Sequence, residues 1–173
     1  MIYVQSCLEE KNVSKAYESL QKYLQRIRKI EKKAWSNFSF LDFMINYKKA
    51  EMDKKEIKFV LNIELQHINI PEEDLVIILG NLLDNAIEAA EKCEKNERYI
   101  NLGIYNRNNM LLMSIENSSN RIPKIEKGTF ITSKPDKILH GLGTESVREL
   151  VNQYNGETLF EYTEKNFKVE ILI

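Results

Sequence analysis

The sequence predicts an α+β fold in which a helical region is followed by a domain of strands and helices. Residues 12–33 repeat apolar side chains every three or four positions, which is typical of an amphipathic helix. Residues 57–65 instead alternate apolar and polar side chains, as a strand with one buried face does. The helical period returns between 71 and 93. We therefore expect a helical front joined to a mixed body.

The helical front is predicted to contain a hairpin. Residues 1–8 fit the end of one helix, 9–12 a turn and 12–33 the returning helix. Residues 38–52 are a further helical candidate. Because the chain starts inside an apolar, helix-compatible segment without an N-cap residue, we expect an excised fragment whose first helix begins upstream.

The mixed body begins with the strand at 57–65 and continues with a helix and a hairpin. Pro71 and the three carboxylates after it mark a helix start, because proline fits the first turn and negative charge favours the positive end of the helix dipole. This helix should reach about Cys93. The strands expected at 99–105 and 110–116 flank a polar turn that suits a hairpin.

The rest of the body is predicted to be a loop, a helix and two strands. The segment 117–143 is long, polar and aperiodic, and such loops in compact domains are usually functional or mobile. Residues 144–154 favour a helix that ends at Asn155-Gly156. Strands at 158–162 and 167–173 close the chain.

Charge and composition exclude several classes of protein. The net charge of -1 combines +7 over residues 11–58 (13 basic, 6 acidic) with -6 over 59–173 (12 basic, 18 acidic) and -2 over 1–10. A near-neutral total argues against a nucleic-acid-binding protein. Two distant cysteines indicate neither a disulfide framework nor a zinc site and favour a reducing compartment. A reducing compartment makes a cytoplasmic location the expectation. No stretch approaches the ~20 apolar residues that span a bilayer.

The most informative segment is 80–90, where the helical period places Asn81, Asn85 and Glu88 within about 60° of one another, opposite an apolar cluster. Solvated helix faces normally carry Lys, Glu and Gln, because asparagine is a weaker helix former. We therefore interpret the aligned amides as functional. Asparagine offers a neutral oxygen that suits Mg²⁺ among phosphates, and it cannot act as a general base. This face is predicted to hold a metal nucleotide rather than to activate water.

Gly141 and Gly143 stand just before the helix expected at 144–154. Glycines there let the backbone approach a phosphate, which the helix N-terminus can bind, although a simple turn is an alternative interpretation. The chain has no GxxxxGK[ST] motif, no protein-kinase motif set and no strand leading directly into the glycines. A P-loop, a protein-kinase site and a dinucleotide fold are thereby disfavoured.

The order of these motifs resembles the ATP-binding domain of sensor histidine kinases. These kinases share the Bergerat, or GHKL, fold with gyrase, heat-shock ninety chaperones and mismatch-repair ATPases. Within them, the chain is most similar to quorum-sensing peptide-receptor kinases of Gram-positive bacteria. The resemblance covers 57–173 and implies a two-layer α/β sandwich with a mixed, mostly antiparallel sheet. It implies an ATP-binding domain at 53–173, after a truncated dimerisation and linker region at 1–52.

The helix with the two asparagines resembles the N box of these kinases. By that resemblance, Asn85 ligates Mg²⁺ and Glu88 lies close to the phosphates or the metal. Asn81 takes the position where hydrolytic relatives have a catalytic glutamate. An amide at that position favours phosphotransfer over attack by water, and Asn81 and Glu88 are the candidates for a catalytic role.

The polar loop resembles the other boxes of the family. Gly141-Leu142-Gly143 is similar to the G2 box, and Phe130 to the F box. Residues 117–121 align with the adenine-reading DxGxG box, in which Asn117 keeps a hydrogen-bond acceptor but the glycines are missing.

Lys134 and His140 are further candidates for phosphate contacts in the loop, and a bland loop role is the alternative for each. The chain has two histidines, His67 and His140, and neither lies in a segment that resembles the family's His box. We therefore expect the phosphoacceptor histidine to be absent from this fragment.

The resemblance implies the catalytic fragment of a sensor histidine kinase that uses ATP and Mg²⁺ in two-component signalling. The γ-phosphoryl would pass to a histidine outside the fragment, so the fragment itself would not autophosphorylate. The implied partners are a second copy through the N-terminal helices, a response regulator, and a membrane sensor region in the full-length receptor. The alternative is a kinase-fold binding or scaffold protein, or a sporulation-type phosphotransferase, that makes little use of nucleotide.

Overall fold

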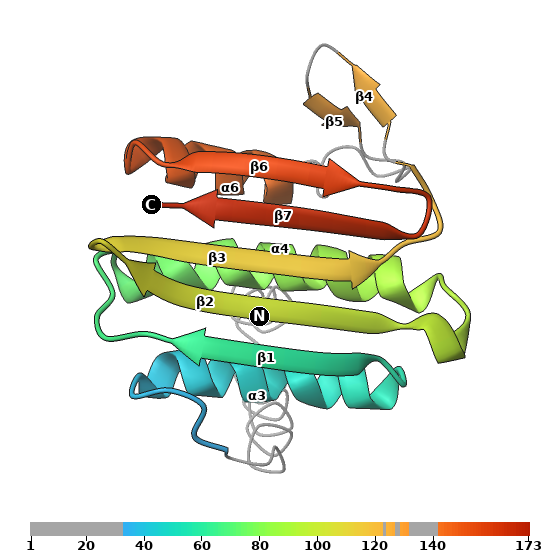
Figure 1. Ribbon diagram of the computed structural model, residues 1–173, viewed down its shortest axis with the longest axis horizontal. Helices are drawn as coiled ribbons and strands as arrows, with labels where there is room; N and C mark the ends of the chain where they lie inside the picture. Colours follow the sequence, from blue (N-terminus) through green and yellow to red (C-terminus); the bar gives the residue numbers. More distant parts are fainter. Residues whose placement is uncertain (1–32, 123, 127–128, 132–141) are drawn as a thin grey trace, which may run out of the picture. The chain divides into compact units, whose positions relative to one another are not determined.

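A five-stranded sheet with helices on one face organises residues 34–173 (Figure 1). The computed structural model describes residues 33–122, 124–126, 129–131 and 142–173, with side chains for 33–122 and 146–173. Across the sheet the strands are β1 (Lys58–Glu64), β2 (Tyr99–Arg107), β3 (Met110–Ser118), β7 (Asn166–Leu172) and β6 (Glu157–Tyr162). β1 is parallel to β2 and every other neighbouring pair is antiparallel. The predicted α+β fold with a mixed, mostly antiparallel sheet is confirmed.

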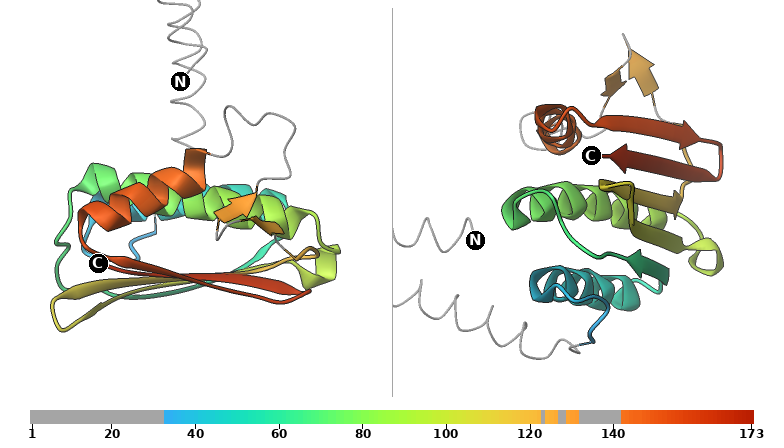
Figure 2. Two further views of the ribbon diagram at one scale, coloured as in Figure 1. Left: turned by 90° about the horizontal axis from the view of Figure 1, so that it is seen from above. Right: turned by 60° about the vertical axis from the view of Figure 1, so that its left-hand side comes forward.

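The helices lie on the same side of the sheet, as the view from above shows (Figure 2). They are α3 (Ser39–Lys54), α4 (Glu72–Glu91) and α6 (Leu142–Gln153). A short 3₁₀ turn, η1 (Lys95–Glu97), precedes β2, and a two-stranded ribbon, β4 (Lys124–Glu126) with β5 (Thr129–Ile131), precedes α6. None of the described helices is long and apolar enough to cross a membrane.

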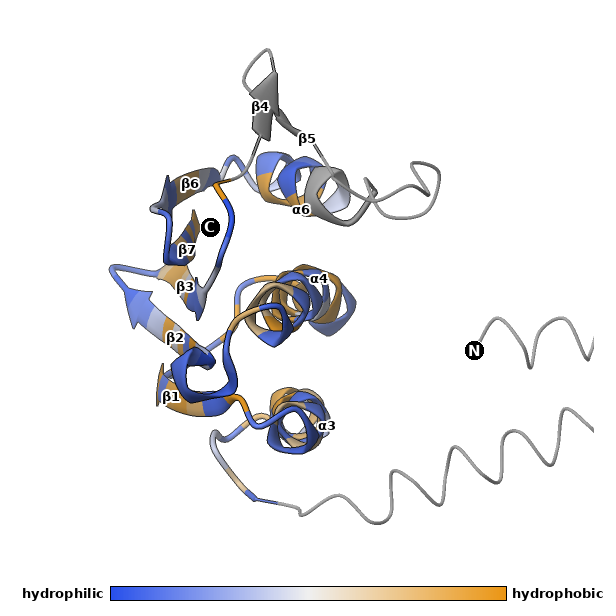
Figure 3. Cartoon of the chain, turned by 90° about the vertical axis from the view of Figure 1, so that its right-hand side faces the viewer, coloured by the Kyte–Doolittle hydropathy of each residue, from blue (hydrophilic) through white to orange (hydrophobic). Residues whose placement is uncertain are grey.

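The core lies between the sheet and the helices. Alternate residues of β2 and β3 are buried on the helix-covered side, for example Leu102 and Met113, and they pack against Leu79 and Leu83 of α4. α4 is amphipathic, and Figure 3 shows both hydrophobic and hydrophilic residues along it. Its long run of buried leucine, isoleucine and alanine explains why this segment forms a central helix.

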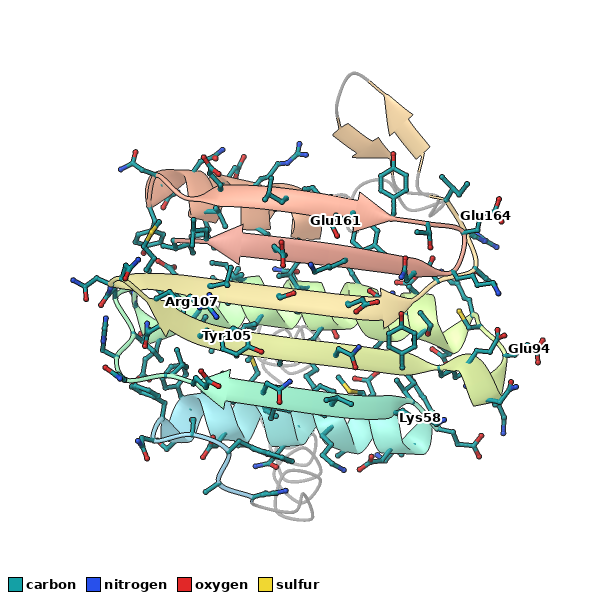
Figure 4. The ribbon with its side chains drawn as sticks, in the orientation of Figure 1. Lys58, Glu94, Tyr105, Arg107, Glu161 and Glu164 are labelled. Carbon is teal, nitrogen blue, oxygen red and sulfur yellow. The ribbon has the colours of Figure 1, made fainter. Side chains whose placement is uncertain are left out.

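The other face of the sheet is exposed and polar. Figure 4 shows Lys58, Tyr105 and Glu161 on this outer face, away from the helices. Glu116 of β3 accepts hydrogen bonds there from Tyr99 at 2.9 Å and from Asn166 at 3.3 Å. Polar side chains that pair across strands allow this face of an antiparallel sheet to meet water.

Two turns use asparagine in the left-handed region. Asn108 and Asn109 have φ values of 49° and 63°, which suits a tight hairpin between β2 and β3. After α6, Asn155 has a φ of 53°. The following Gly156 is needed for space, because a Cβ there would lie 2.5 Å from the carbonyl oxygen of Leu172. The predicted Asn-Gly helix end is therefore present, with asparagine at the left-handed position.

The expected elements of the body are present, with shifted boundaries. The helix predicted at 144–154 begins at Leu142, and the helix predicted to reach Cys93 ends at Glu91. The segment predicted as one long loop at 117–143 contains the last residues of β3 and the β4–β5 ribbon, because two three-residue strands are too short to show a period.

The helical hairpin predicted at 1–33 lies outside the described residues, apart from Lys33. Helix α3 packs against β1 and α4 and belongs to the compact unit Ala34–Ile173. The predicted division into a 1–52 dimerisation region and a 53–173 domain stays a prediction, and the structure adds that α3 shares a core with the sheet.

Candidate functional site

The polar face of α4 carries the predicted amides. Asn85 is exposed and Asn81 and Glu88 are half-buried, whereas Leu82 and Leu83 between them are buried. Pro71 immediately precedes the helix and Glu72, Glu73 and Asp74 fill its first turn, which favours the helix start. The structure therefore places Asn81, Asn85 and Glu88 on the side of α4 that faces away from the core.

Local bonds hold two of these three side chains. The side-chain nitrogen of Asn81 donates to the Ile77 carbonyl at 2.8 Å. The side-chain oxygen is then the atom that can bind a ligand. Glu88 accepts from Lys92 at 2.9 Å, one turn further along the helix. An oxygen-rich face results, on which the carboxylate of Glu88 is already partly neutralised by a lysine.

Gly80 leaves open space beside this face. A Cβ built at Gly80 would meet no heavy atom within 4 Å. Packing therefore does not require glycine here, although glycine weakens a helix by roughly 1 kcal/mol relative to alanine. Among the described residues nothing crowds a side chain at position 80, which agrees with the interpretation that the surroundings of Asn81 serve a function.

Helix α6 runs back along α4 in the opposite direction (Figure 2). Tyr154, directly after α6, donates a hydrogen bond to Asp74 in the first turn of α4. The start of α6 at Leu142 lies 12 residues before Tyr154, about 18 Å along a helix, and the same distance along α4 from Asp74 ends near Ala86. In this antiparallel arrangement, the N-terminus of α6 falls beside the second half of α4, which contains Asn85.

The predicted glycine pair meets this helix start. Gly143 and Leu142 form the first turn of α6, and Gly141 lies outside the described residues. A helix N-terminus carries partial positive charge and unpaired amides that favour anions. The fold thus brings an anion-favouring helix end and the oxygen-rich face of α4 to the same level of the domain.

Asn117 lies at the end of β3 and is 2% exposed. It shares the helix-covered face with Met113 and Ile115, and its amide nitrogen donates to the Ser118 carbonyl at 2.8 Å. Asn120 donates to the Lys92 carbonyl at 2.7 Å and so ties the loop after β3 to the end of α4. Asn117 therefore lies on the helix-covered side of the sheet, beside a loop that is anchored to α4, and its base-reading role stays a prediction.

Several of the predicted site residues are not among the residues or side chains that the structure describes. Lys134 and His140 are outside the described residues, and Phe130 lies in β5 without a described side chain. His67 follows β1, where its backbone amide donates to the side-chain oxygen of Asn106 at 3.1 Å. The structure thus tests neither the F-box residue nor the loop contacts to phosphate.

A hollow of ≈ 940 Å³ among the described residues lies beyond the polar face rather than on it. It is lined by the end of α4, the start of β2, the loop after β3 and the β6–β7 turn, including Lys92, Tyr99 and Glu164. Asn81 and Asn85 do not line it. We place the candidate site at the amides because their chemistry, and not the depth of a hollow, matches a nucleotide.

Arg98 is a structural residue that sequence reasoning missed. Its guanidinium donates to the carbonyls of Lys55 at 2.8 Å, Glu91 at 2.8 Å and Cys93 at 3.0 Å. These are carbonyls at the C-terminal ends of α3 and α4, which lack partners within a helix. A single arginine before a strand has no distinguishing local pattern, so only the tertiary fold reveals this clamp.

The donor set of the polar face fits a hard cation shared with a ligand. Among the described residues, no three His, Cys, Asp or Glu side chains gather to hold a metal by themselves. Mg²⁺ takes oxygen ligands and is commonly bound through one or two protein groups together with substrate phosphates. The side-chain oxygens of Asn81, Asn85 and Glu88 match that mode of binding.

Comparison with known proteins identifies the family. A family profile described as "GHKL domain" matches residues 71–173, which is more than half of the chain. The chain belongs to the GHKL domain family. No protein among those with curated descriptions matches it.

Solved histidine kinase structures share the fold. The catalytic domain of the histidine kinase ThkA is 20% identical, with a TM-score of 0.61, over 78% of this chain and 89% of that one. A mycobacterial sensor histidine kinase, MprB, is 16% identical, with a TM-score of 0.58, over 75% and 91%. The Acinetobacter baumannii histidine kinase AdeS is 15% identical, with a TM-score of 0.58, over 98% and 82%. The predicted GHKL fold of histidine kinase catalytic domains is thereby confirmed.

Proposed function

We propose that this chain binds Mg²⁺ and ATP between the polar face of α4 and the segment 117–143, as the catalytic domain of a sensor histidine kinase. The observation that carries the proposal is the antiparallel course of α6 along α4, joined at one end by the Tyr154–Asp74 bond, which directs the N-terminus of α6 toward the half of α4 that contains Asn85. Oxygen ligands for a cation and amides for an anion then meet at one place. Membership of the GHKL family supports the same conclusion.

Each part of the site has a separate role in this proposal. Asn85 would supply an amide oxygen to Mg²⁺, which neutralises phosphate charge when bound, and Glu88 would lie beside it. The first turn of α6, with Gly143, would hold phosphate oxygens. Asn117 would accept a hydrogen bond from the amino group of adenine. Lys134, His140, Gly141, Leu142 and Phe130 remain proposed contacts from the same segment.

The chemistry proposed is phosphoryl transfer to a histidine. An asparagine cannot remove a proton from water, so Asn81 would hold the nucleotide without promoting hydrolysis. Catalysis would then consist of positioning and charge neutralisation, which is how phosphoryl transfer is generally accelerated. The accepting histidine would come from outside this chain, because neither His67 nor His140 lies in a segment that resembles a His box.

The finer identity is also a proposal. The resemblance to peptide-receptor kinases supports a role in quorum sensing, with a membrane sensor region in the receptor and a cytoplasmic catalytic part. Dimerisation through the N-terminal helices and transfer onward to a response regulator complete this proposal. The concentration of positive charge in residues 11–58, +7 from 13 basic and 6 acidic side chains, supports a distinct task for that segment.

A specific observation favours a second candidate, a kinase-fold binding protein with little use of nucleotide. Residues 117–121 lack the glycines of an adenine-reading turn. Asn117 is 2% exposed, and Asn120 is committed to the Lys92 carbonyl, which ties the loop after β3 to the end of α4. If this tie persists when nucleotide is added, the adenine would have little access to the side-chain oxygen of Asn117 at the end of β3.

Isothermal titration of the full chain with Mg²⁺ and a non-hydrolysable ATP analogue distinguishes the two candidates. The kinase proposal expects saturable binding that weakens when Mg²⁺ is chelated. Asn85→Ala should weaken the Mg²⁺-dependent affinity by about tenfold or more, or ~1.4 kcal/mol. Asn152→Ala, at an exposed asparagine of α6, is the matched control and should leave affinity unchanged. A folded chain that takes up no nucleotide would favour the scaffold candidate.

A further inference from the structure

Lys48 of α3 reaches across to the polar face of α4. Its ammonium group forms an ion pair with Asp84, the residue directly before Asn85. The side chain of Lys48 is 12% exposed and that of Asp84 is 60% exposed, so the lysine is largely buried and the carboxylate with which it pairs is not. The Lys48 ammonium also lies 5.8 Å from the centre of the Tyr47 ring.

A second ion pair repeats this link two turns further on. Lys55, just after α3, pairs with Glu91 at 2.7 Å, and the two pairs are spaced by seven residues on both helices. Equal spacing in the same order means that α3 and α4 run parallel, in a fixed register. Arg98 strengthens the far end by donating to the carbonyls of both Lys55 and Glu91. α3 is therefore joined to α4 at two levels, of which the Lys48 level adjoins Asn85.

Electrostatics gives the Lys48 pair a consequence beyond helix packing. The polar face of α4 has two carboxylates near Asn85, those of Asp84 and Glu88, and nucleotide phosphates are also negative. Two charges about 4 Å apart interact more strongly near a protein surface than they do in bulk water. Lys48 neutralises Asp84, and Lys92 pairs with Glu88. Without Lys48, the carboxylate of Asp84 would oppose an approaching phosphate.

We propose that Lys48 is a positioning residue of the nucleotide site, which acts through Asp84 to lower the negative charge beside Asn85 and to hold this turn of α4 against α3. The inference rests on the proposed nucleotide function and adds a regulatory link to it. A change in α3 that breaks the Lys48–Asp84 pair lowers nucleotide affinity. Helix α3 directly follows the N-terminal segment. The affinity of the site is thus set partly from another helix.

Titration of the full chain with Mg²⁺ and the ATP analogue tests the electrostatic part. Lys48→Met should raise the Kd by about threefold to tenfold, since the exposed carboxylate is partly screened. Lys49→Met is the matched control, because Lys49 pairs with Asp53 at 2.6 Å within α3 and leaves α4 untouched. Its Kd should stay within about twofold of the unmodified chain. Lys48→Arg keeps the charge and should also stay close to the unmodified chain.

The double variant Lys48→Met with Asp84→Asn separates charge from packing. If Lys48 acts by neutralising Asp84, removing both charges should return the Kd to within about twofold of the unmodified chain. A loss that persists in the double variant would overturn the electrostatic part of the proposal, since it would show that the charge of Asp84 is not what weakens binding. An unchanged Kd in Lys48→Met would overturn it as well.

Hydrogen exchange of the nucleotide-free chain tests the positioning part independently of binding. Lys48→Met should speed exchange of the amides around Asn85, whereas Lys49→Met should not. If the unmodified chain fails to bind nucleotide, the proposed function fails and the exchange result still decides whether Lys48 holds α4. Equal exchange in the two variants would reject the positioning role, whatever the outcome of the titration.

Discussion

The hydroxyl of Tyr154 donates a hydrogen bond to the carboxylate of Asp74 and so joins the residue after α6 to the first turn of α4. This contact spans 80 residues of sequence. It aligns α6 against α4 in opposite directions, and this alignment directs the start of α6 toward the half of α4 that contains Asn85. The candidate site therefore depends on a contact at the other end of α6.

Replacing the Tyr154 hydroxyl should disturb the candidate site at a distance. We expect Tyr154→Phe to lower the Tm and to weaken Mg²⁺–nucleotide affinity, because α6 loses its bond to α4. Tyr105→Phe is the control, since the Tyr105 ring lies over Gly103 on the outer face of the sheet and far from α6. Thermal denaturation and calorimetric titration measure both effects. Equal behaviour of the two variants would contradict the role given to the Tyr154–Asp74 bond.

High pH should release the same contact. The hydrogen bond to Asp74 raises the pKa of Tyr154 above 10.0. The pKa of Tyr99 is also raised, mainly by burial and to a smaller extent by its hydrogen bond to Glu116. A tyrosine with a raised folded-state pKa contributes stability that is fully present below the unfolded pKa and is lost as the pH rises through the folded pKa.

Stability measured by denaturant unfolding should therefore be constant with respect to these two tyrosines below pH 10.0 and should fall above it. The fall should be smaller in Tyr154→Phe, because one of the two linked groups has been removed. Tyrosinate absorbance during an alkaline titration provides the pKa values directly. Ionisation of both tyrosines at or below the ordinary pKa would contradict this prediction.

Removing the Arg98 clamp should destabilise the domain. Arg98→Met leaves the carbonyls of Lys55, Glu91 and Cys93 without their donor, and we expect a loss of about 2 kcal/mol in the free energy of unfolding. Arg107→Met, at the exposed end of β2, should change this free energy by no more than about 0.5 kcal/mol. Urea unfolding of the two variants measures the difference. Similar losses in both would show that the three carbonyls are adequately hydrated without Arg98.

Two glycines should respond to alanine with opposite signs. Gly80→Ala adds a Cβ in open space within a helix, so it should raise the free energy of unfolding by about 0.5–1 kcal/mol. Gly156→Ala brings a Cβ within 2.5 Å of the Leu172 carbonyl oxygen and 2.9 Å of Val151, so it should lower that free energy by about 1–3 kcal/mol. Denaturant unfolding gives both values. Destabilisation by Gly80→Ala would mean that this glycine is required by the fold.

Much of the fold follows from local patterns. The alternation in 57–65 and the helical period between 71 and 93 each depend on which residues of one element face the core, so β1 and α4 were predicted near their observed limits. The β4–β5 ribbon was missed because three residues are too few to reveal alternation. The strand order across the sheet was not predicted, because the resemblance to a known family implied only a mixed, mostly antiparallel sheet.

The candidate site, like the fold, was predicted in part from local patterns. The common face of Asn81, Asn85 and Glu88 follows from helix geometry alone, because residues three and four apart lie on one side. The roles assigned to Lys134, His140 and Phe130 stay predictions. Lys48 and Arg98 were not predicted, because neither residue stands in a distinctive pattern and both act on partners from other elements.

The sequence by itself determined the helix with an amide face, the alternating strands and the Asn-Gly end of α6, since each depends on residues only a few positions apart. The tertiary structure alone decided that Lys48 pairs with Asp84, that Tyr154 bonds to Asp74 and that Arg98 joins the ends of α3 and α4. Those partners are 36, 80 and up to 43 residues apart. They meet because the sheet sets the spacing and direction of the helices that cover it, and no local pattern encodes that arrangement.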